Sequence, residues 1–245
     1  MDLKLKGKRA LVLGASSGLG YAIAEALVQE SVQVAICSRD EARIQKAGKS
    51  MHAALALTCD ISKLGAVTAL IKSVTAQWGG IDILVTNTGG PPKGLFTEIN
   101  REQWQEGFQS LWMSTVDAIQ SVLPGMKERR WGRILLVTSA AAKEPMAHLT
   151  VSNGLRAGLL GLTKSICHEV ASFGITVNAL LPGYTRTERL QELGIPEEKI
   201  TASIPAGRLG EPHEFASLAA FLSSQQAGYI TGQAIACDGG YLKGI

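Results

Sequence analysis

The chain has 245 residues, of which 46% are hydrophobic and 18% are charged, and its net charge at pH 7 is +3. This composition excludes a disordered or fibrous protein, and a mild charge with only 5% aromatic residues argues against nucleic-acid binding. We therefore expect a globular chain with a large hydrophobic core, organised as one domain over residues 1–245.

The four cysteines are scattered singly, at Cys37, Cys59, Cys167 and Cys237. Their spacing is typical neither of a zinc site nor of a disulfide framework, so we expect no metal and free thiols in a reducing compartment. Residues 1–9 are charged and polar, unlike a signal peptide, and no apolar run reaches the roughly 18 residues of a membrane span. The sequence predicts a cytoplasmic protein without a membrane partner.

Short apolar runs alternate with longer stretches of helical periodicity along most of the chain. The predicted strands are 9–15, 32–37, 53–60, 81–87, 132–139, 175–183 and 234–240, and the predicted helices include 21–30, 65–78, 103–128 and 213–224. This alternation is typical of a parallel sheet, and uniformly apolar strands indicate helices on both faces. We expect an α/β, Rossmann-type doubly wound sheet of about seven strands.

Three glycines, Gly14, Gly18 and Gly20, separate the first strand from the first helix. Glycines permit a tight turn and let the backbone approach a phosphate, which the free amides and the positive end of the helix stabilise. The spacing Gly-x-x-x-Gly-x-Gly differs from the commoner dinucleotide fingerprint, and such turns also occur for packing alone. The favoured interpretation is a site for a dinucleotide.

The second predicted strand leads into Ser38, Arg39 and Asp40. In dinucleotide-binding folds this position faces the adenosine ribose, where an acid binds the 2′-hydroxyl and a cation accommodates a 2′-phosphate. No acid stands at 38 or 39, and Arg39 supplies a guanidinium, so NADP(H) is favoured over NAD(H). The alternative is a solvated Arg39 beside an Asp40 that caps the next helix.

The segment 149–165 predicts a further helix with an apolar stripe at Leu155, Leu159 and Leu162. Ser152 and Arg156 lie one turn apart on another face, near the amino end. Either they cap a helix that only packs and form its solvated face, or they belong to a catalytic site.

The only long irregular region lies at about residues 184–210 and contains Pro196 and Pro205. Inside a compact domain such a region is more often a lid or binding loop than a domain boundary. We expect it to be a substrate loop.

Taken together, these pieces resemble the classical short-chain dehydrogenase/reductases over nearly the whole chain. The resemblance is carried by the glycine turn, "CDIS", "TNTGG", "LLVTSAAA", "VNALLPGYTRT" and the terminal "TGQAIACDGG". Within that family the chain looks most similar to 3-oxoacyl-(acyl carrier protein) reductase-like members. The resemblance implies hydride transfer with a small carbonyl or alcohol substrate, an acyl thioester being one candidate. It also implies a homotetramer formed through apolar helices.

The resemblance further implies a set of cofactor contacts. Asp60 would contact adenine, Asn87 would lie along the adenosine side, and the segment from Pro182 would cover the nicotinamide. Each has a plainer alternative: a helix cap, a self-stabilised turn or a chain reversal. The implied cofactor-binding residues are Gly14, Ser16, Ser17, Gly18, Leu19, Gly20, Ser38, Arg39, Asp60, Ile61, Asn87, Gly89, Arg156, Pro182, Gly183, Thr185 and Thr187.

At the catalytic positions the chain departs from the family. The family uses a Ser, a Tyr and a Lys, often with an Asn; here Ser139 is kept, and Ser152, Arg156 and Leu111 stand at the other three positions. The catalytic candidates are therefore Ser139, Ser152 and Arg156. An aliphatic hydroxyl is a far poorer acid than a phenol, and a guanidinium cannot relay a proton, so weak or altered hydride transfer is expected.

Several alternatives stay open from the sequence. His148 or Tyr184 could replace the missing proton donor, although each is more commonly a surface or packing residue. Ser139 could be a strand-end hydroxyl that only satisfies the backbone. The chain as a whole could be a dinucleotide-binding protein without turnover, acting as a sensor or a partner in an assembly.

Overall fold

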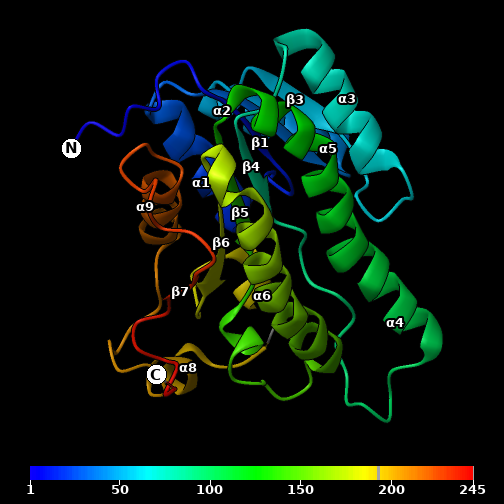
Figure 1. The fold of residues 1–245 in the computed structure, drawn as a ribbon. Helices are drawn as coiled ribbons and strands as arrows, with labels where there is room; N and C mark the ends of the chain where they lie inside the picture. Colours follow the sequence, from blue (N-terminus) through cyan, green and yellow to red (C-terminus); the bar gives the residue numbers. More distant parts are fainter. Residues whose placement is uncertain (192–193, 245) are drawn as a thin grey trace.

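The computed structural model describes residues 1–191 and 194–244, and its centre is one parallel sheet (Figure 1). The strands are β1 (Arg9–Val12), β2 (Gln33–Ser38), β3 (Leu55–Thr58), β4 (Ile83–Thr86), β5 (Gly132–Val137), β6 (Ile175–Pro182) and β7 (Ala234–Cys237). Their order is β3-β2-β1-β4-β5-β6-β7, and every neighbouring pair is parallel. The predicted Rossmann-type doubly wound fold of about seven strands is confirmed.

Helices cover both faces of the sheet (Figure 1). One layer contains α3 (Ala66–Trp78), α5 (Ser114–Arg129) and α6 (Thr150–Val170), and the other contains α1 (Gly18–Gln29), α2 (Glu41–Met51) and α9 (Pro212–Leu222). Successive residues of a strand point to opposite helix layers: Ile134 packs with the layer of α3, α5 and α6, and Leu135 packs with the layer of α1, α2 and α9. A slip of one residue would exchange the two faces, so this pattern fixes the register.

The helix predicted at 103–128 is interrupted by a π-helical turn. The chain runs through α4 (Arg101–Gly107), the π-helical turn η1 (Phe108–Met113) and α5. A capping box between Asn100 and Gln103 starts α4, since each side chain binds the other's backbone amide. Hydrophobic periodicity predicted one long helix but not the π-helical turn, because such a turn shifts the spacing of apolar residues at only one point.

The strand order places the predicted functional segments at one edge of the sheet. β1 and β4 are neighbours, and the chain leaves them toward opposite halves of the sheet. In such sheets ligands bind outside the carboxyl ends of the strands at this point of reversal. The glycine turn follows β1, the "TNTGG" loop follows β4, and Ser139 follows β5. The fold therefore brings these segments together.

The predicted substrate loop, about 184–210, contains two short helices, α7 (Glu188–Gln191) and α8 (Glu197–Thr201), and its residues 192–193 lie outside the described residues. Ile200, Ile204 and Leu209 form a small hydrophobic cluster with Tyr184 and Tyr241. The carboxyl end of the chain lies beside α8 (Figure 1). The described residues also form two 3₁₀ turns, η2 (Ala140–Ala142) and η3 (Ala171–Phe173).

Among the described residues, no helix combines the length and the apolar character needed to cross a membrane. The four cysteines are free thiols, and three of them, Cys37, Cys59 and Cys167, are buried.

Candidate functional site

The glycine turn is held against the neighbouring strand by Asn87. Its Nδ2 donates to the Gly14 carbonyl at 2.8 Å, so Asn87 binds across to the glycine turn rather than within its own turn. Gly14 has φ +60°, and a Cβ there would collide with the Asn87 carbonyl; a Cβ on Gly20 would collide with the Gly14 carbonyl. These close approaches explain the glycines at 14 and 20.

The amino end of α1 has the features of a phosphate site. Ser17, at the N-cap, makes no side-chain hydrogen bond to the helix, and the first turn holds no acidic residue. The amides of Gly18, Leu19 and Gly20 therefore lack a side-chain cap, and they lie at the positive end of a 12-residue helix. Ser16 completes the turn that leads into them. The residues present fit the diphosphate of a dinucleotide.

After β2, the guanidinium that lies beside the glycine turn is that of Arg43, in α2, and not that of Arg39. Arg43 Nη2 donates to Ser17 Oγ at 3.1 Å and to Glu188 Oε2 at 2.6 Å. Arg39 is exposed, Asp40 caps α2 by accepting from the Arg43 amide, and the Ser38 hydroxyl donates to the Asp40 carbonyl.

Sequence reasoning missed Arg43. The available signal was its position in the first turn of the helix that Asp40 caps, because first-turn side chains lie at the same end of a helix as its cap.

On the adenine side, Asp60 forms a local turn. Its Oδ1 accepts from the Ser62 amide at 3.0 Å and from the Ser62 hydroxyl at 2.7 Å. This hydrogen bonding to Ser62 outweighs burial and lowers the pKa of the Asp60 carboxyl. A surface hollow of about 360 Å³ adjoins it, lined by Cys59, Asp60 and Lys63 among others, and Ile61 packs against the core.

The segment after β6 crosses from that strand to the glycine turn. The Gly183 amide donates to the Cys237 carbonyl at 3.0 Å, and a Cβ at Gly183 would lie 2.6 Å from Asp238 Cα. Thr185 is buried and forms an isolated bridge with Gly210. The Thr187 methyl lies 3.5 Å from where a Cβ on Gly18 would stand. Residues 182–187 are thus anchored at one end and meet the glycine turn at the other.

Ser139 follows β5 and caps the 3₁₀ turn η2. Its Oγ accepts from the Ala141 amide at 3.1 Å. The backbone-satisfying role foreseen as an alternative is therefore present, but it uses only an acceptor lone pair of the hydroxyl. The Ser139 O–H proton remains able to donate to a ligand oxygen.

Ser152 and Arg156 are both buried, with 7% and 8% of their surface exposed, so the interpretation as a solvated helix face is wrong. Arg156 Nε donates to Ser152 Oγ at 3.1 Å. Its Nη1 donates to the carbonyls of Val137 at 3.1 Å and Thr138 at 2.7 Å. Its Nη2 donates to the Gly89 carbonyl at 2.5 Å. The guanidinium connects α6 to the ends of β4 and β5.

These bonds engage four of the five N–H groups of a guanidinium. Burial, and then the charge of Arg189, lower the pKa of Arg156 to about 10. The group therefore stays protonated at neutral pH. One of its N–H groups has no hydrogen-bond acceptor among the described residues, and its positive charge lies close to Ser152.

The two alternative proton donors are placed differently. Tyr184 packs edge-on against Tyr241, with ring centroids 5.2 Å apart, and burial followed by Tyr241 raises its pKa to about 12. His148 is exposed, and its carbonyl accepts from the Gly94 amide. Within the described residues, neither side chain is hydrogen-bonded to Ser139, Ser152 or Arg156. The geometry favours the packing interpretation for Tyr184.

Leu111, which we expected at the position of the family's Asn, is 1% exposed and belongs to one of the two large hydrophobic clusters. It lies within the π-helical turn η1. The side chain of Leu111 therefore has a packing role.

Comparison with known proteins covers almost the whole chain. A family profile described as enoyl-(acyl carrier protein) reductase matches residues 14–242. A 3-oxoacyl-(acyl-carrier-protein) reductase of Vibrio cholerae is 36% identical, over 97% of this chain and 98% of that protein.

Two solved structures share the fold closely. YwfH, an NADPH-dependent reductase involved in bacilysin biosynthesis, has a TM-score of 0.94 and 32% identity, covering 98% of this chain and 100% of that one. L-sorbose reductase from Gluconobacter frateurii, in complex with NADPH and L-sorbose, has a TM-score of 0.95 and 29% identity, covering 100% of both chains.

Proposed function

Because the chain belongs to the short-chain dehydrogenase/reductase family, we propose that it binds NADP(H) and moves hydride to or from a small carbonyl or alcohol substrate, slowly or by an altered proton path. The observation that carries this proposal is the junction of Asn87 with Gly14 beside the uncapped amides of α1. The residues on the dinucleotide side fit a diphosphate, whereas Ser152 and Arg156 stand where we expect the proton donor. The two similar structures, one an NADPH-dependent reductase and the other in complex with NADPH, support the choice of cofactor.

The chain's own residues would hold the cofactor, which supplies or accepts the hydride when bound. The amides of Gly18 to Gly20 would bind its diphosphate. Arg43 and Ser17, with Arg39 nearby along the chain, would bind the 2′-phosphate. Asp60 and Asn87 would lie along the adenosine, and the segment from Pro182 to Thr187 would cover the nicotinamide.

On the substrate side, two donors are available for a carbonyl oxygen. These are the Ser139 hydroxyl and the remaining N–H of Arg156. Both stabilise negative charge on that oxygen, but Ser152 is too weak an acid to complete the protonation. Loss of a positioned general acid typically lowers rates by about 10²- to 10⁴-fold, so turnover should be slow.

A second candidate is a dinucleotide-binding protein without turnover, serving as a sensor or an assembly partner. It is favoured by the four hydrogen bonds of Arg156 and the burial of Leu111, which give both replacements structural roles. The deciding experiment is a cofactor titration followed, on the same sample, by a panel of carbonyl and alcohol substrates monitored at the nicotinamide absorbance. Binding with no turnover of any substrate selects the second candidate.

The cofactor preference gives the first prediction. We expect NADPH to bind at least about tenfold more tightly than NADH, since Arg43 would add a charge-assisted bond to the 2′-phosphate. Arg43→Ala should remove most of this preference and leave NADH affinity unchanged. Arg39→Ala is the matched variant for the sequence-based interpretation, and fluorescence titration measures all three proteins. Equal affinities of the unmodified protein for the two cofactors would contradict the prediction.

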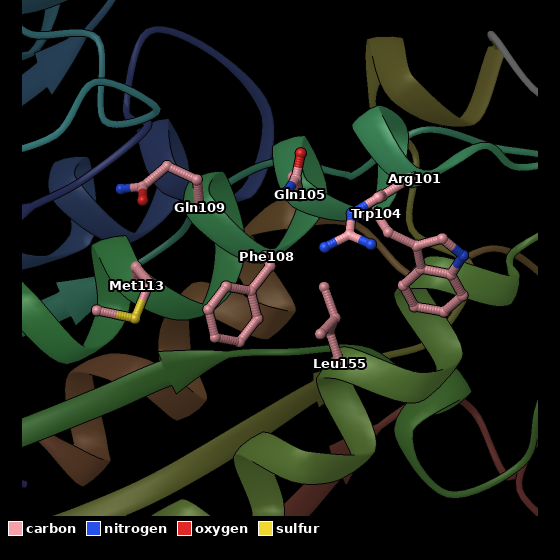
Figure 2. A pocket seen from close by; sticks show the side chains of 7 residues that line it. All are labelled: Arg101, Trp104, Gln105, Phe108, Gln109, Met113 and Leu155. Carbon is pink, nitrogen blue, oxygen red and sulfur yellow. The ribbon is translucent and has the colours of Figure 1, made fainter.

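We also propose a homo-oligomer, a tetramer by analogy with the family, that works in the cytoplasm. A surface hollow of about 550 Å³ lies between α4, η1 and α6 (Figure 2). Figure 2 shows the Phe108 ring and the Leu155 side chain on this hollow, with Trp104 and Met113 on the same surface. A second copy of the chain would cover this apolar surface. Residues 184–210 are proposed as the substrate loop.

A further inference from the structure

The guanidinium of Arg189 occupies the space that a side chain at position 90 would fill. Arg189 lies in α7, and its guanidinium packs on Gly90, in the loop that follows β4. A Cβ at Gly90 would collide with Cζ and Nη2 of Arg189 and would lie 2.6 Å from Nη1. The guanidinium of Arg189 can therefore lie here only because residue 90 has no side chain.

A second guanidinium approaches the same loop. Arg156 Nη2 donates to the carbonyl of Gly89, the residue before Gly90. The two positive charges repel each other, which contributes to the lowered pKa of Arg156. Among residues 1–191 and 194–244, no ion pair joins either arginine to a carboxylate, and Glu188 is paired with Arg43.

Two other sites in the molecule show which groups satisfy a guanidinium in this protein. At the opposite edge of the sheet, Arg9 and Arg129 converge on Asp82 at 2.7 and 3.2 Å, so two guanidinium groups share a carboxylate. Arg133 is buried without a carboxylate, held by backbone carbonyls and the Trp131 ring. One guanidinium can thus be satisfied by carbonyls. Two guanidinium groups that approach one loop without a carboxylate between them favour the binding of an anion there.

The anionic groups of the proposed cofactor have other positions. Its diphosphate fits the amino end of α1, and its 2′-phosphate fits Arg43 and Ser17. Arg189 follows Glu188 in the chain but points to the other side, toward Gly90 and Arg156. It is also exposed, so a ligand can reach it. The anion that remains to be placed is one on the substrate.

We propose that Arg189 pairs with a carboxylate of the substrate, so that the preferred substrate is an oxo acid rather than a neutral carbonyl compound or an acyl thioester. This deepens the proposed function and rests on it. The planar guanidinium of Arg189 matches a carboxylate with two parallel hydrogen bonds. The charge of Arg156 adds to the attraction, and its free N–H together with Ser139 is left for the carbonyl oxygen.

The test compares free acids with their neutral esters. The probes are 2-oxopentanoate, 3-oxopentanoate and 4-oxopentanoate, each against its methyl ester, and binding is measured by calorimetry with saturating NADPH and again without it. At least one acid should bind about tenfold more tightly than its ester. This difference should vanish in Arg189→Gln and recover in part in Arg189→Lys. Arg186→Gln is the matched control, because Arg186 lies on the same segment but pairs with Glu197 and Glu211.

Three outcomes would overturn the proposal. They are equal binding or no binding of acids and esters, an acid preference that survives Arg189→Gln, and a tenfold loss of NADPH affinity in Arg189→Gln without any acid preference. The last would assign the guanidinium to the cofactor's diphosphate. The readout of this test is substrate binding, which needs no turnover. Absence of turnover or of NADPH binding would contradict the proposed function. The comparison of acids with esters would still decide the present inference.

Discussion

At the scale of single residues, Arg156, which we expect at the position of the family's lysine, also has a structural role. It is buried, and it donates to three backbone carbonyls and to Ser152 Oγ. A lysine ammonium has three donors on one nitrogen and cannot reach acceptors spread over α6, β5 and the loop after β4. The arginine is therefore part of the structure as well as of the candidate site.

This gives a prediction for stability. Arg156→Lys keeps the charge but leaves buried carbonyls such as those of Val137 and Thr138 without a donor, at a cost of about 2 kcal/mol. For a chain of this length we expect the melting temperature to fall by about 4–8 °C, measured by calorimetry. Arg186→Lys, at an exposed position, is the control and should change it by less than about 2 °C. An unchanged melting temperature for Arg156→Lys would show that the hydrogen bonds of Arg156 add nothing to stability.

The sequence predicted some of these residues and missed others for a physical reason. Ser152 and Arg156 could be paired from their spacing, because residues four apart share a helix face. Arg43 and Arg189 could not, since their partners, Ser17 and Gly90, lie on other elements far away in the chain. No local pattern encodes such a contact. The consequences of Ser152 and Arg156 for catalysis remain predictions.

At the scale of elements, the segment from Pro182 to Leu190 crosses the candidate site. Thr187 meets Gly18, and Glu188 binds Arg43, which also binds Ser17. The carboxylate of Glu188 thus occupies the guanidinium proposed for the 2′-phosphate. A cofactor with a 2′-phosphate would have to displace Glu188, and one without it would not.

From this competition we expect Glu188→Gln to bind NADPH about two- to fivefold more tightly, because an exposed ion pair is worth about 0.2–1 kcal/mol. NADH affinity should stay the same. The gain should shrink as salt rises, since the pair is solvent-exposed. Fluorescence titration of both cofactors at two ionic strengths measures this, with Glu197→Gln as the control on the same segment. Weaker NADPH binding by Glu188→Gln would show instead that Glu188 holds the segment in its binding position.

Element types were predictable where the pattern is strong. All seven predicted strands are present, and α1, α3 and α9 lie where helical periodicity predicted them. The helix α2 was expected only as the helix that Asp40 would cap, and the structure confirms that cap; its buried positions, Ile44, Ala47 and Met51, lie at helical spacing. The π-helical turn was missed because it leaves the apolar stripe nearly unbroken.

At the scale of the whole molecule, the fold followed from the alternation of strands and helices, since a parallel sheet with covered faces has few allowed connections. The strand order then put the glycine turn and Asn87 side by side at the carboxyl edge. Which surface of the molecule meets another copy does not follow in the same way. An apolar helix face in the sequence serves equally well against the sheet or against a second chain.

We expect the surface between α4, η1 and α6 to be an interface of the proposed homo-oligomer. Phe108 is 44% exposed and stacks on Trp112 at 6.2 Å, at the edge of the hollow in Figure 2. We expect light scattering to give about four times the 25.9 kDa mass of one chain. Phe108→Glu would place a charge within the proposed interface, where an unpaired charge costs several kcal/mol, so this variant should dissociate into smaller species.

Phe96→Glu separates this effect from a general effect of adding a charge. Phe96 is 72% exposed and lies in the loop after β4, outside the residues that line the hollow. It should leave the oligomer intact, and both variants should keep the circular dichroism of the folded chain. If the unmodified protein has the mass of one chain, or if Phe96→Glu dissociates it and Phe108→Glu does not, the surface between α4, η1 and α6 is not the interface. The exposed Phe108 would then have to be explained by a different partner of apolar character.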